Sequence, residues 1–224
     1  MQRLIIPALL FVGLMSAALL LPIQMVSGQT AQTHVDGIVF VGDSLTLGAS
    51  ASAPANTYVY QVVDFLGRPW NAFLSFTSGT DLDAACQAGQ GGYSVAIIEL
   101  GAHAVIEGQM SPDQFRQYYS ALLDCAGGET VVAGTIPWLG WSADAPEYAR
   151  ADLYSQIIRD EAVKRGMPIA DLWSAMKLQP ALISIPQDYV FFGSYQGDNF
   201  HPNDAGHAVI AQTYEQAFVG EYND

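Results

Sequence analysis

The feature that most constrains this chain is a regular alternation between short apolar runs and segments with a helical pattern of apolar residues. Uninterrupted apolar runs are typical of parallel strands that are buried on both faces. Because helical material follows each run, the pattern predicts an α/β fold in which helices cover both faces of a parallel sheet. The five predicted strands are residues 37–41, 71–76, 95–100, 130–136 and 168–172. A single domain is the usual outcome at a length of 224 residues.

Capping residues mark several helix boundaries. Ser111 and Pro112 suit the N-cap and first position of a helix that Gly127 ends. Pro146 begins a long helix that we expect to run through Arg165. Further helical segments are expected over residues 57–66, 81–87 and 204–219. Residues 178–199 are the least regular stretch, and their aromatic side chains either pack in the core or line a pocket: Tyr189, Phe191, Phe192 and Tyr195.

The first 28 residues have the pattern of a secretory signal peptide. Arg3 is their only charged residue, residues 4–21 are uncharged and apolar, and residues 26–28 offer modest side chains before a cleavage site. The 18-residue apolar stretch also approaches the length of a membrane span, so a retained anchor is the alternative. Both interpretations place the domain outside the cytoplasm. We therefore divide the chain into a signal peptide or N-terminal membrane anchor (1–28), a linker (29–35) and one domain (36–224).

The charge balance excludes some partners. Eight Lys and Arg residues stand against 22 Asp and Glu residues, a formal net charge of −14. Nucleic acids and anionic membrane surfaces attract basic proteins, so neither is an expected partner. A membrane is a partner only if the N-terminal segment is retained. The chain contains no G-x-G-x-x-G or P-loop motif, and we expect no cofactor. The oligomeric state stays open.

Two cysteines, Cys86 and Cys125, lie after the N-terminal segment. An even number of cysteines in an exported chain indicates a disulfide, which we expect between these two. Two buried free thiols are the alternative. Neither cysteine has a histidine near it in the sequence, so a thiol nucleophile has little support.

Polar residues follow the predicted strands at the edge where ligands bind in open parallel sheets. Ser44 follows the first strand, Gly79 the second and His103 the third, and Asp198 and His201 come near the end of the chain. A hydroxyl, backbone N–H groups, histidines and a carboxylate can supply a nucleophile, an oxyanion hole, a general base and the group that orients it. The set therefore indicates nucleophilic catalysis by serine.

Two motifs resemble a known family. Residues 39–48 read VFVGDSLTLG and resemble the first block of the GDSL, or SGNH, hydrolases; residues 198–207 read DNFHPNDAGH and resemble the last block. Residues 157–172, which end in GMPIADL, are also similar to that family. The resemblance covers essentially the whole chain after its N-terminal segment. It implies a three-layer α/β/α sandwich with a flavodoxin-like five-stranded parallel sheet, and chemistry on carboxylic esters.

The resemblance also implies a role for each site residue. Ser44 would be the nucleophile, His201 the general base and Asp198 the residue that orients the imidazole. The backbone N–H groups of Ser44 and Gly79 would donate to the oxyanion. These roles agree with the chemistry, because serine is a weak nucleophile until a neutral imidazole accepts its proton.

One position departs from the family pattern. The third block reads G-x-N-D in the family, and its Asn side chain is a third oxyanion donor. This chain reads GAHA over residues 101–104, so His103 stands where Asn is expected. An imidazole N–H can fill the same role. The alternative is that His103 only fills a loop.

These observations predict an exported serine esterase that hydrolyses acetylated carbohydrate or lipid esters through an acyl-serine intermediate. Two alternatives stay open: an O-acetyltransferase that acts on sugar hydroxyls, and a non-catalytic glycan- or lipid-binding domain with the same fold. No metal is expected, because His207, the third ligand of an Asp198–His201–His207 set, lies six residues beyond His201 on the last expected helix.

Overall fold

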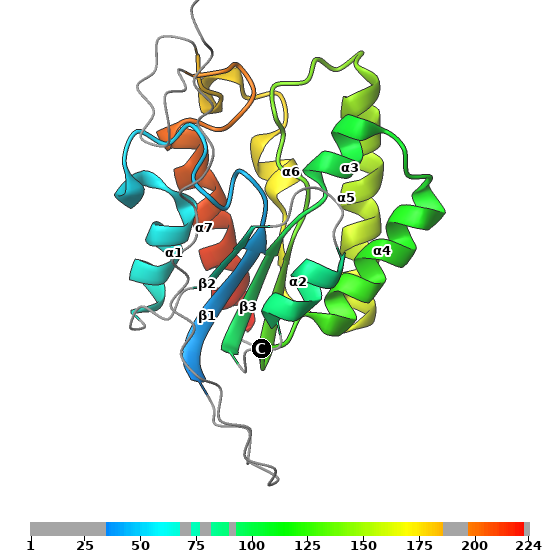
Figure 1. Cartoon of the computed structure of the whole chain (residues 1–224). Coiled ribbons are helices and arrows are strands. Elements are labelled where there is room, and N and C mark those ends of the chain that lie inside the picture. Colours follow the sequence, from blue (N-terminus) through cyan, green and yellow to red (C-terminus); the bar gives the residue numbers. More distant parts are fainter. Residues whose placement is uncertain (1–34, 68–72, 77–81, 90–92, 186–196, 222–224) are drawn as a thin grey trace, which may run out of the picture. The chain divides into compact units, whose positions relative to one another are not determined.

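Five parallel strands form the central sheet, as the alternating pattern predicts. The computed structural model describes residues 35–67, 73–76, 82–89, 93–185 and 197–221 (Figure 1). The strand order is β2-β1-β3-β4-β5, which places β1 and β3 inside the sheet and leaves β2 and β5 at its edges. The strands are β1 (Val35–Gly42), β2 (Phe73–Phe76), β3 (Tyr93–Glu99), β4 (Thr130–Gly134) and β5 (Ile169–Ala170).

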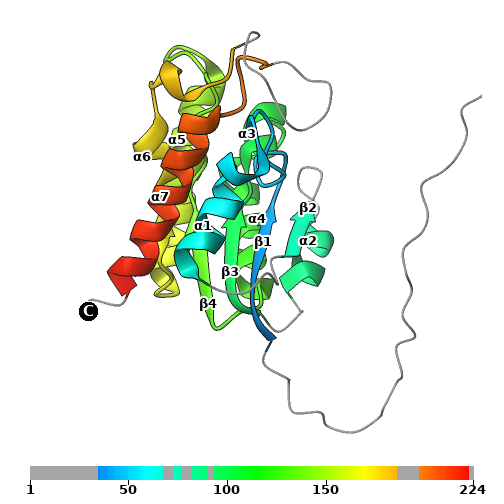
Figure 2. The same ribbon diagram turned by 90° about the vertical axis from the view of Figure 1, so that its left-hand side faces the viewer.

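Helices cover both faces of this sheet, which gives the expected three-layer α/β/α arrangement (Figures 1 and 2). On one face α1 (Tyr58–Leu66) lies beside α7 (Asp204–Glu221). On the other face α4 (Pro112–Cys125) lies beside α5 (Pro146–Lys164) and α2 (Leu82–Gly89). The shorter elements are α3 (Ala102–Glu107), α6 (Leu172–Met176) and two 3₁₀ turns, Pro54–Asn56 and Pro180–Leu182.

Buried aromatic pairs join the helices within each layer. Tyr58 of α1 stacks on Tyr214 of α7, with ring centroids 5.7 Å apart. Phe115 of α4 stacks on Tyr154 of α5 at 3.9 Å. All four side chains are at most 1% exposed, so each pair adds contact energy to the burial of its apolar area.

Two elements differ from the sequence prediction. The fifth strand does not reach residue 172, because the Asp171 side chain accepts a hydrogen bond from the Ser174 N–H and begins α6 there. The segment after β3, for which the sequence predicted no element, forms the helix α3. Gly101 turns the chain into this helix with a φ of +130°, a conformation that glycine adopts without the clash of a Cβ atom.

Some of the predicted features lie outside the described residues. These are the predicted signal peptide or anchor, residues 1–28, and the aromatic residues Tyr189, Phe191, Phe192 and Tyr195. Val35, predicted as the last linker residue, begins β1 and pairs with Tyr93. Within the described ranges, no helix is both long enough and apolar enough to cross a membrane.

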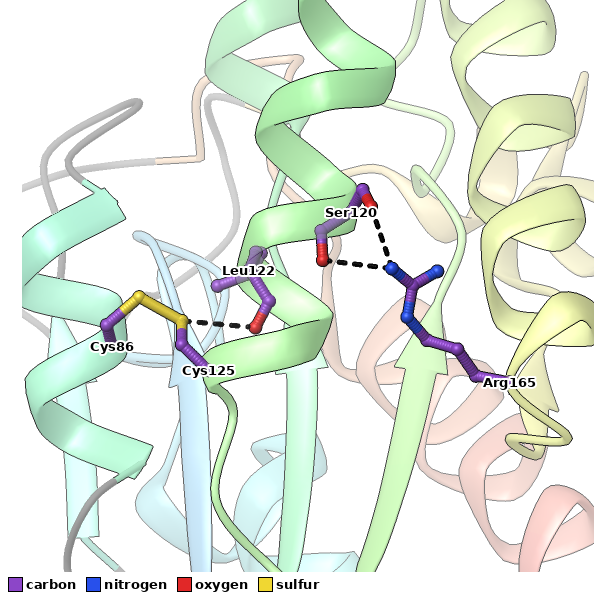
Figure 3. Close-up of a disulfide and its surroundings, with 5 residues drawn as sticks. All are labelled: Cys86, Ser120, Leu122, Cys125 and Arg165. Atoms are coloured by element: carbon purple, nitrogen blue, oxygen red, sulfur yellow. Dashed lines mark hydrogen bonds between the residues drawn. A yellow bond between two sulfur atoms is a disulfide. The ribbon is translucent and has the colours of Figure 1, made fainter.

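A disulfide joins Cys86 of α2 to Cys125, the last residue of α4, as expected (Figure 3). Their Cα atoms are 5.1 Å apart. Arg165, just after α5, donates to Ser120 Oγ at 2.7 Å and to Asp124 Oδ1 at 2.8 Å. The end of α4 is therefore tied covalently to α2 and by hydrogen bonds to the end of α5.

Reduction of this disulfide is expected to lower the melting temperature by several degrees. The cross-link closes a span of 39 residues, and its loss typically costs about 2–4 kcal/mol. Melting curves with and without reductant measure the effect. The Cys86→Ser/Cys125→Ser protein is the matched control, since reductant should leave its melting temperature unchanged. Two thiols that react with an alkylating agent in the native protein, purified without reductant, would contradict the expectation.

Candidate active site

Ser44 lies in a tight turn that begins where β1 ends. The Asp43 carboxylate accepts a hydrogen bond from the Leu45 N–H at 3.1 Å, a local bond that favours such turns. The Ala49 N–H donates to the Ser44 carbonyl at 2.9 Å. A Cβ atom at Gly42 would lie 1.8 Å from Thr46 Oγ1, so only glycine lets the chain fold back this closely.

The structure brings Ser44, His201 and Asp198 into one hydrogen-bonded chain. Ser44 Oγ lies 2.9 Å from His201 Nε2, although the two residues are 157 positions apart in the sequence. His201 Nδ1 is hydrogen-bonded to Asp198 Oδ2. The side chains of His201 and Asp198 are 19% and 39% exposed, so the group lies at the surface of the domain within reach of a substrate.

The Asp198 carboxylate is held by several donors. Its Oδ1 accepts from the His201 N–H at 2.8 Å and from the Phe200 N–H at 3.0 Å. Ser184 Oγ lies 3.1 Å from the same oxygen. Burial alone would raise the pKa of Asp198, but the bonds from the His201 backbone and imidazole outweigh it and lower the pKa. An ionised Asp198 holds the proton on Nδ1, which leaves Nε2 free to accept the proton of Ser44.

Asn203 and Asp204, which follow His201 in the last motif, anchor this loop at the start of α7 through hydrogen bonds. The Asn203 side chain accepts from the Gly206 N–H at 3.1 Å and donates to the Ala181 carbonyl at 2.9 Å. The Asp204 carboxylate accepts from the Ser52 N–H at 2.8 Å and from Asn56 Nδ2 at 2.9 Å. These bonds connect the loop of His201 to the segment that follows the Ser44 turn.

His207 has a structural place in this arrangement. Its side chain is fully buried, its Nε2 lies 3.0 Å from the Ala49 carbonyl and its Nδ1 accepts from the Tyr58 N–H at 3.4 Å. Burial lowers the pKa of His207, so its ring is neutral at neutral pH. Both ring nitrogens face protein partners, and His207 therefore does not form a ligand set with Asp198 and His201.

His103 lies in the first turn of α3, directly after the carboxyl end of β3. Its Nδ1 lies 3.8 Å from Glu107 Oε1, and its side chain is 37% exposed. A proton on either His103 or His201 would favour the ionised form of Asp43, so both rings lie near that carboxylate. Gly79, the other expected oxyanion donor besides Ser44, lies outside the described residues.

The loop between β4 and α5 contacts the residues just before His201, which the sequence did not indicate. The Phe200 ring stands perpendicular to the His201 ring, with centroids 5.0 Å apart, and Trp141 packs edge-on against Phe200. Gly140 has a φ of +78°, and a Cβ atom there would lie 2.9 Å from the Asn199 carbonyl oxygen.

The sequence also did not single out Ser184, Asn56 and Glu99 as residues near the site. Glu99 alone had a detectable signal, because it is an acidic residue at the end of an apolar run.

Comparison with known proteins gives a family match and a set of similar folds. Residues 40–209 match the model of the GDSL-like lipase/acylhydrolase family. A lipase/acylhydrolase from Enterococcus faecalis is 19% identical, with a TM-score of 0.63 over 84% of this chain and 97% of that one. A catalytic mutant of an acetylxylan esterase from Geobacillus stearothermophilus is 19% identical, with a TM-score of 0.58 over 82% and 95%. At these identities the likeness shows the fold alone. No curated protein matches the sequence.

Proposed function

This chain belongs to the GDSL-like lipase/acylhydrolase family and is an ester-hydrolysing enzyme, and on that premise we propose that it is an exported serine esterase acting on acetylated carbohydrates or lipid esters. Ser44 is the proposed nucleophile, His201 the general base and Asp198 the residue that orients it. The observation that carries this assignment is the 2.9 Å contact between Ser44 Oγ and His201 Nε2, with Nδ1 bonded to Asp198.

The arrangement supports a two-step reaction. Ser44 Oγ attacks the ester carbonyl carbon while His201 Nε2 takes its proton. The tetrahedral intermediate collapses, and the alcohol leaves with that proton, so that an acyl-serine remains. Water then attacks the acyl-serine, His201 takes a proton from the water, and the released Ser44 oxygen recovers it. Proton count and charge return to their starting values after each turnover.

The oxyanion of the tetrahedral intermediate needs hydrogen-bond donors. In the proposal these are the backbone N–H groups of Ser44 and Gly79 and the imidazole N–H of His103. The position of His103 just beyond the carboxyl end of β3 supports its part, because ligands bind at that edge of a parallel sheet.

A similar fold and an aromatic side chain support the proposed substrate class. An acetylxylan esterase is among the proteins of similar fold, and that protein acts on an acetylated carbohydrate. The half-buried Phe200 ring next to His201, with the buried Trp141 packed edge-on behind it, provides an aromatic surface on which a sugar or an apolar chain can pack. Export is supported by the signal-like pattern of residues 1–28 and by the disulfide, since disulfides persist in oxidising compartments.

A series of p-nitrophenyl esters with increasing acyl length, together with acetylated sugars, tests this proposal. We expect the highest kcat/KM for acetyl and other short acyl groups if carbohydrate esters are the substrates, and for long acyl groups if lipid esters are. A sugar added as acceptor separates hydrolysis from acetyl transfer, because a transferase forms acetylated sugar instead of free acetate. Turnover that persists in Ser44→Ala would contradict the proposed nucleophile.

A further inference from the structure

Two buried acidic side chains meet next to the nucleophile, and the reaction as described uses neither. Asp43 precedes Ser44, and Glu99 is the last residue of β3; each is 1% exposed. Strand pairing places Gly42 opposite Glu99. Hydrogen bonding between the two carboxyl groups contributes to the pKa of each, so the groups lie close together.

A hydrogen bond between two carboxyl groups requires a proton, because an ionised carboxylate has no donor. Two negative charges this close in a buried site also do not coexist. Burial raises the pKa of Glu99 well above its ordinary range, and the charge of Asp43 raises it further. Burial raises the pKa of Asp43 as well, but the Leu45 N–H and the two nearby histidines oppose that rise. The proton therefore resides on Glu99.

The pair is connected to the Ser44 turn on one side and to α1 on the other. Asp43 Oδ1 accepts from the Leu45 N–H at 3.1 Å, directly beyond Ser44. Glu99 Oε2 accepts from Thr46 Oγ1 at 3.3 Å, and Thr46 Oγ1 lies 2.6 Å from the hydroxyl of Tyr58. The buried network thus spans the whole turn from Asp43 to Thr46.

We propose that Asp43 and Glu99 hold one proton between them and form a positioning pair for the nucleophile. Glu99 donates to Asp43, and the carboxylate of Asp43 is thereby fixed where it accepts the Leu45 N–H. The turn then presents Ser44 Oγ to His201 and the Ser44 N–H to the oxyanion. The inference rests on the proposed function, in which Ser44 is the nucleophile. Glu99 and Asp43 are positioning residues, because they act through the turn and not on the substrate.

Two substitutions of Glu99 test whether the side chain acts as a neutral hydrogen-bonding group, as a charge or only by filling space. Glu99→Gln keeps a donor for Asp43 and an acceptor for Thr46, and we expect its kcat within about threefold of wild type. Glu99→Met has a similar length but no hydrogen bonds; we expect kcat to fall about 10- to 100-fold with KM nearly unchanged, because the Asp43 carboxylate loses its donor. Equal losses in both variants, or no loss in the Met variant, would overturn the proposal.

The shared proton has a second readout that does not depend on activity. Glu99 is protonated in the folded state and ionised in the unfolded state, so its contribution to stability is complete below its ordinary pKa of 4.5 and is lost as pH rises. The unfolding equilibrium constant of the wild type should therefore increase about tenfold per pH unit relative to that of Glu99→Gln. Denaturant unfolding of both proteins between about pH 7 and pH 8.5 measures this difference, in an interval above the ordinary titration of histidine.

The choice of pH interval follows from the groups that face the pair. They are His103 from α3, His201 from the loop before α7, Tyr58 from α1, Tyr119 from α4 and Tyr214 from α7. Burial raises the pKa of all three tyrosines, so they stay neutral there. Equal pH slopes in the two proteins would refute the shared proton. A slope difference in a protein that hydrolyses no ester would instead overturn the proposed function and leave the proton assignment standing.

Discussion

Ser44→Ala and His201→Ala are each expected to lower kcat by at least ~10⁴-fold, and the double variant should be scarcely slower than either single one. The two side chains act as a unit, because the hydroxyl at 2.9 Å from Nε2 attacks only as the imidazole takes its proton. Asp198→Ala should cost less, since Asp198 orients the ring and does not react. Steady-state kinetics on the best ester of the acyl series measures all four proteins.

Ser174→Ala is the matched control for the nucleophile. Ser174 is an exposed serine on α6, and its removal should leave kcat unchanged. A phosphonate probe for reactive serines should label wild type and Ser174→Ala, and should not label Ser44→Ala. More than a few per cent of wild-type activity in Ser44→Ala would rule out the mechanism.

His103→Ala is expected to lower kcat by about 10²–10³-fold and to leave KM nearly unchanged, because an oxyanion donor acts mainly in the transition state. His103→Asn restores the family's residue type at this position and should recover much of that loss. The two variants are compared with wild type on the same ester, so that kcat and KM are separated for each.

Glu107→Gln serves as the control for His103. It removes the charge 3.8 Å from Nδ1 and keeps the shape of the side chain, and we expect less than about a threefold change. If His103→Ala behaves like wild type, His103 only fills space at the start of α3. The oxyanion would then depend on the backbone donors of Ser44 and Gly79.

Local sequence signals predicted the elements that depend on local physics. The apolar runs predicted all five strands of the described sheet, and Ser111 and Pro146 marked helix starts that the structure contains. The two family blocks predicted that Ser44, Asp198 and His201 belong together, and the structure places them in hydrogen-bond contact. Their catalytic roles, and those of Gly79 and His103, stay predictions that the variants above test.

Features that depend on register and on distant contacts had no such signal. α3 has no capping side chain, because the conformation of Gly101 begins it. Ser184 contacts Asp198, which lies 14 positions further along the sequence, and Gly140 meets Asn199 only when the loop after β4 and the loop before α7 have come together. The contact between Asp43 and Glu99 follows from the alignment of β1 with β3, which no single stretch of sequence encodes.

The 157-residue separation between Ser44 and His201 has a consequence for biogenesis. Contacts between remote segments form late in folding, because closing a long loop costs entropy before the contact repays it. With Ser44 as nucleophile and His201 as base, as proposed, the hydroxyl stays a weak nucleophile while the polypeptide emerges and gains its base only when the segment before α7 has docked. Esterase activity therefore requires the complete fold, and a nascent or incompletely folded copy is inactive toward esters in the cell that makes it.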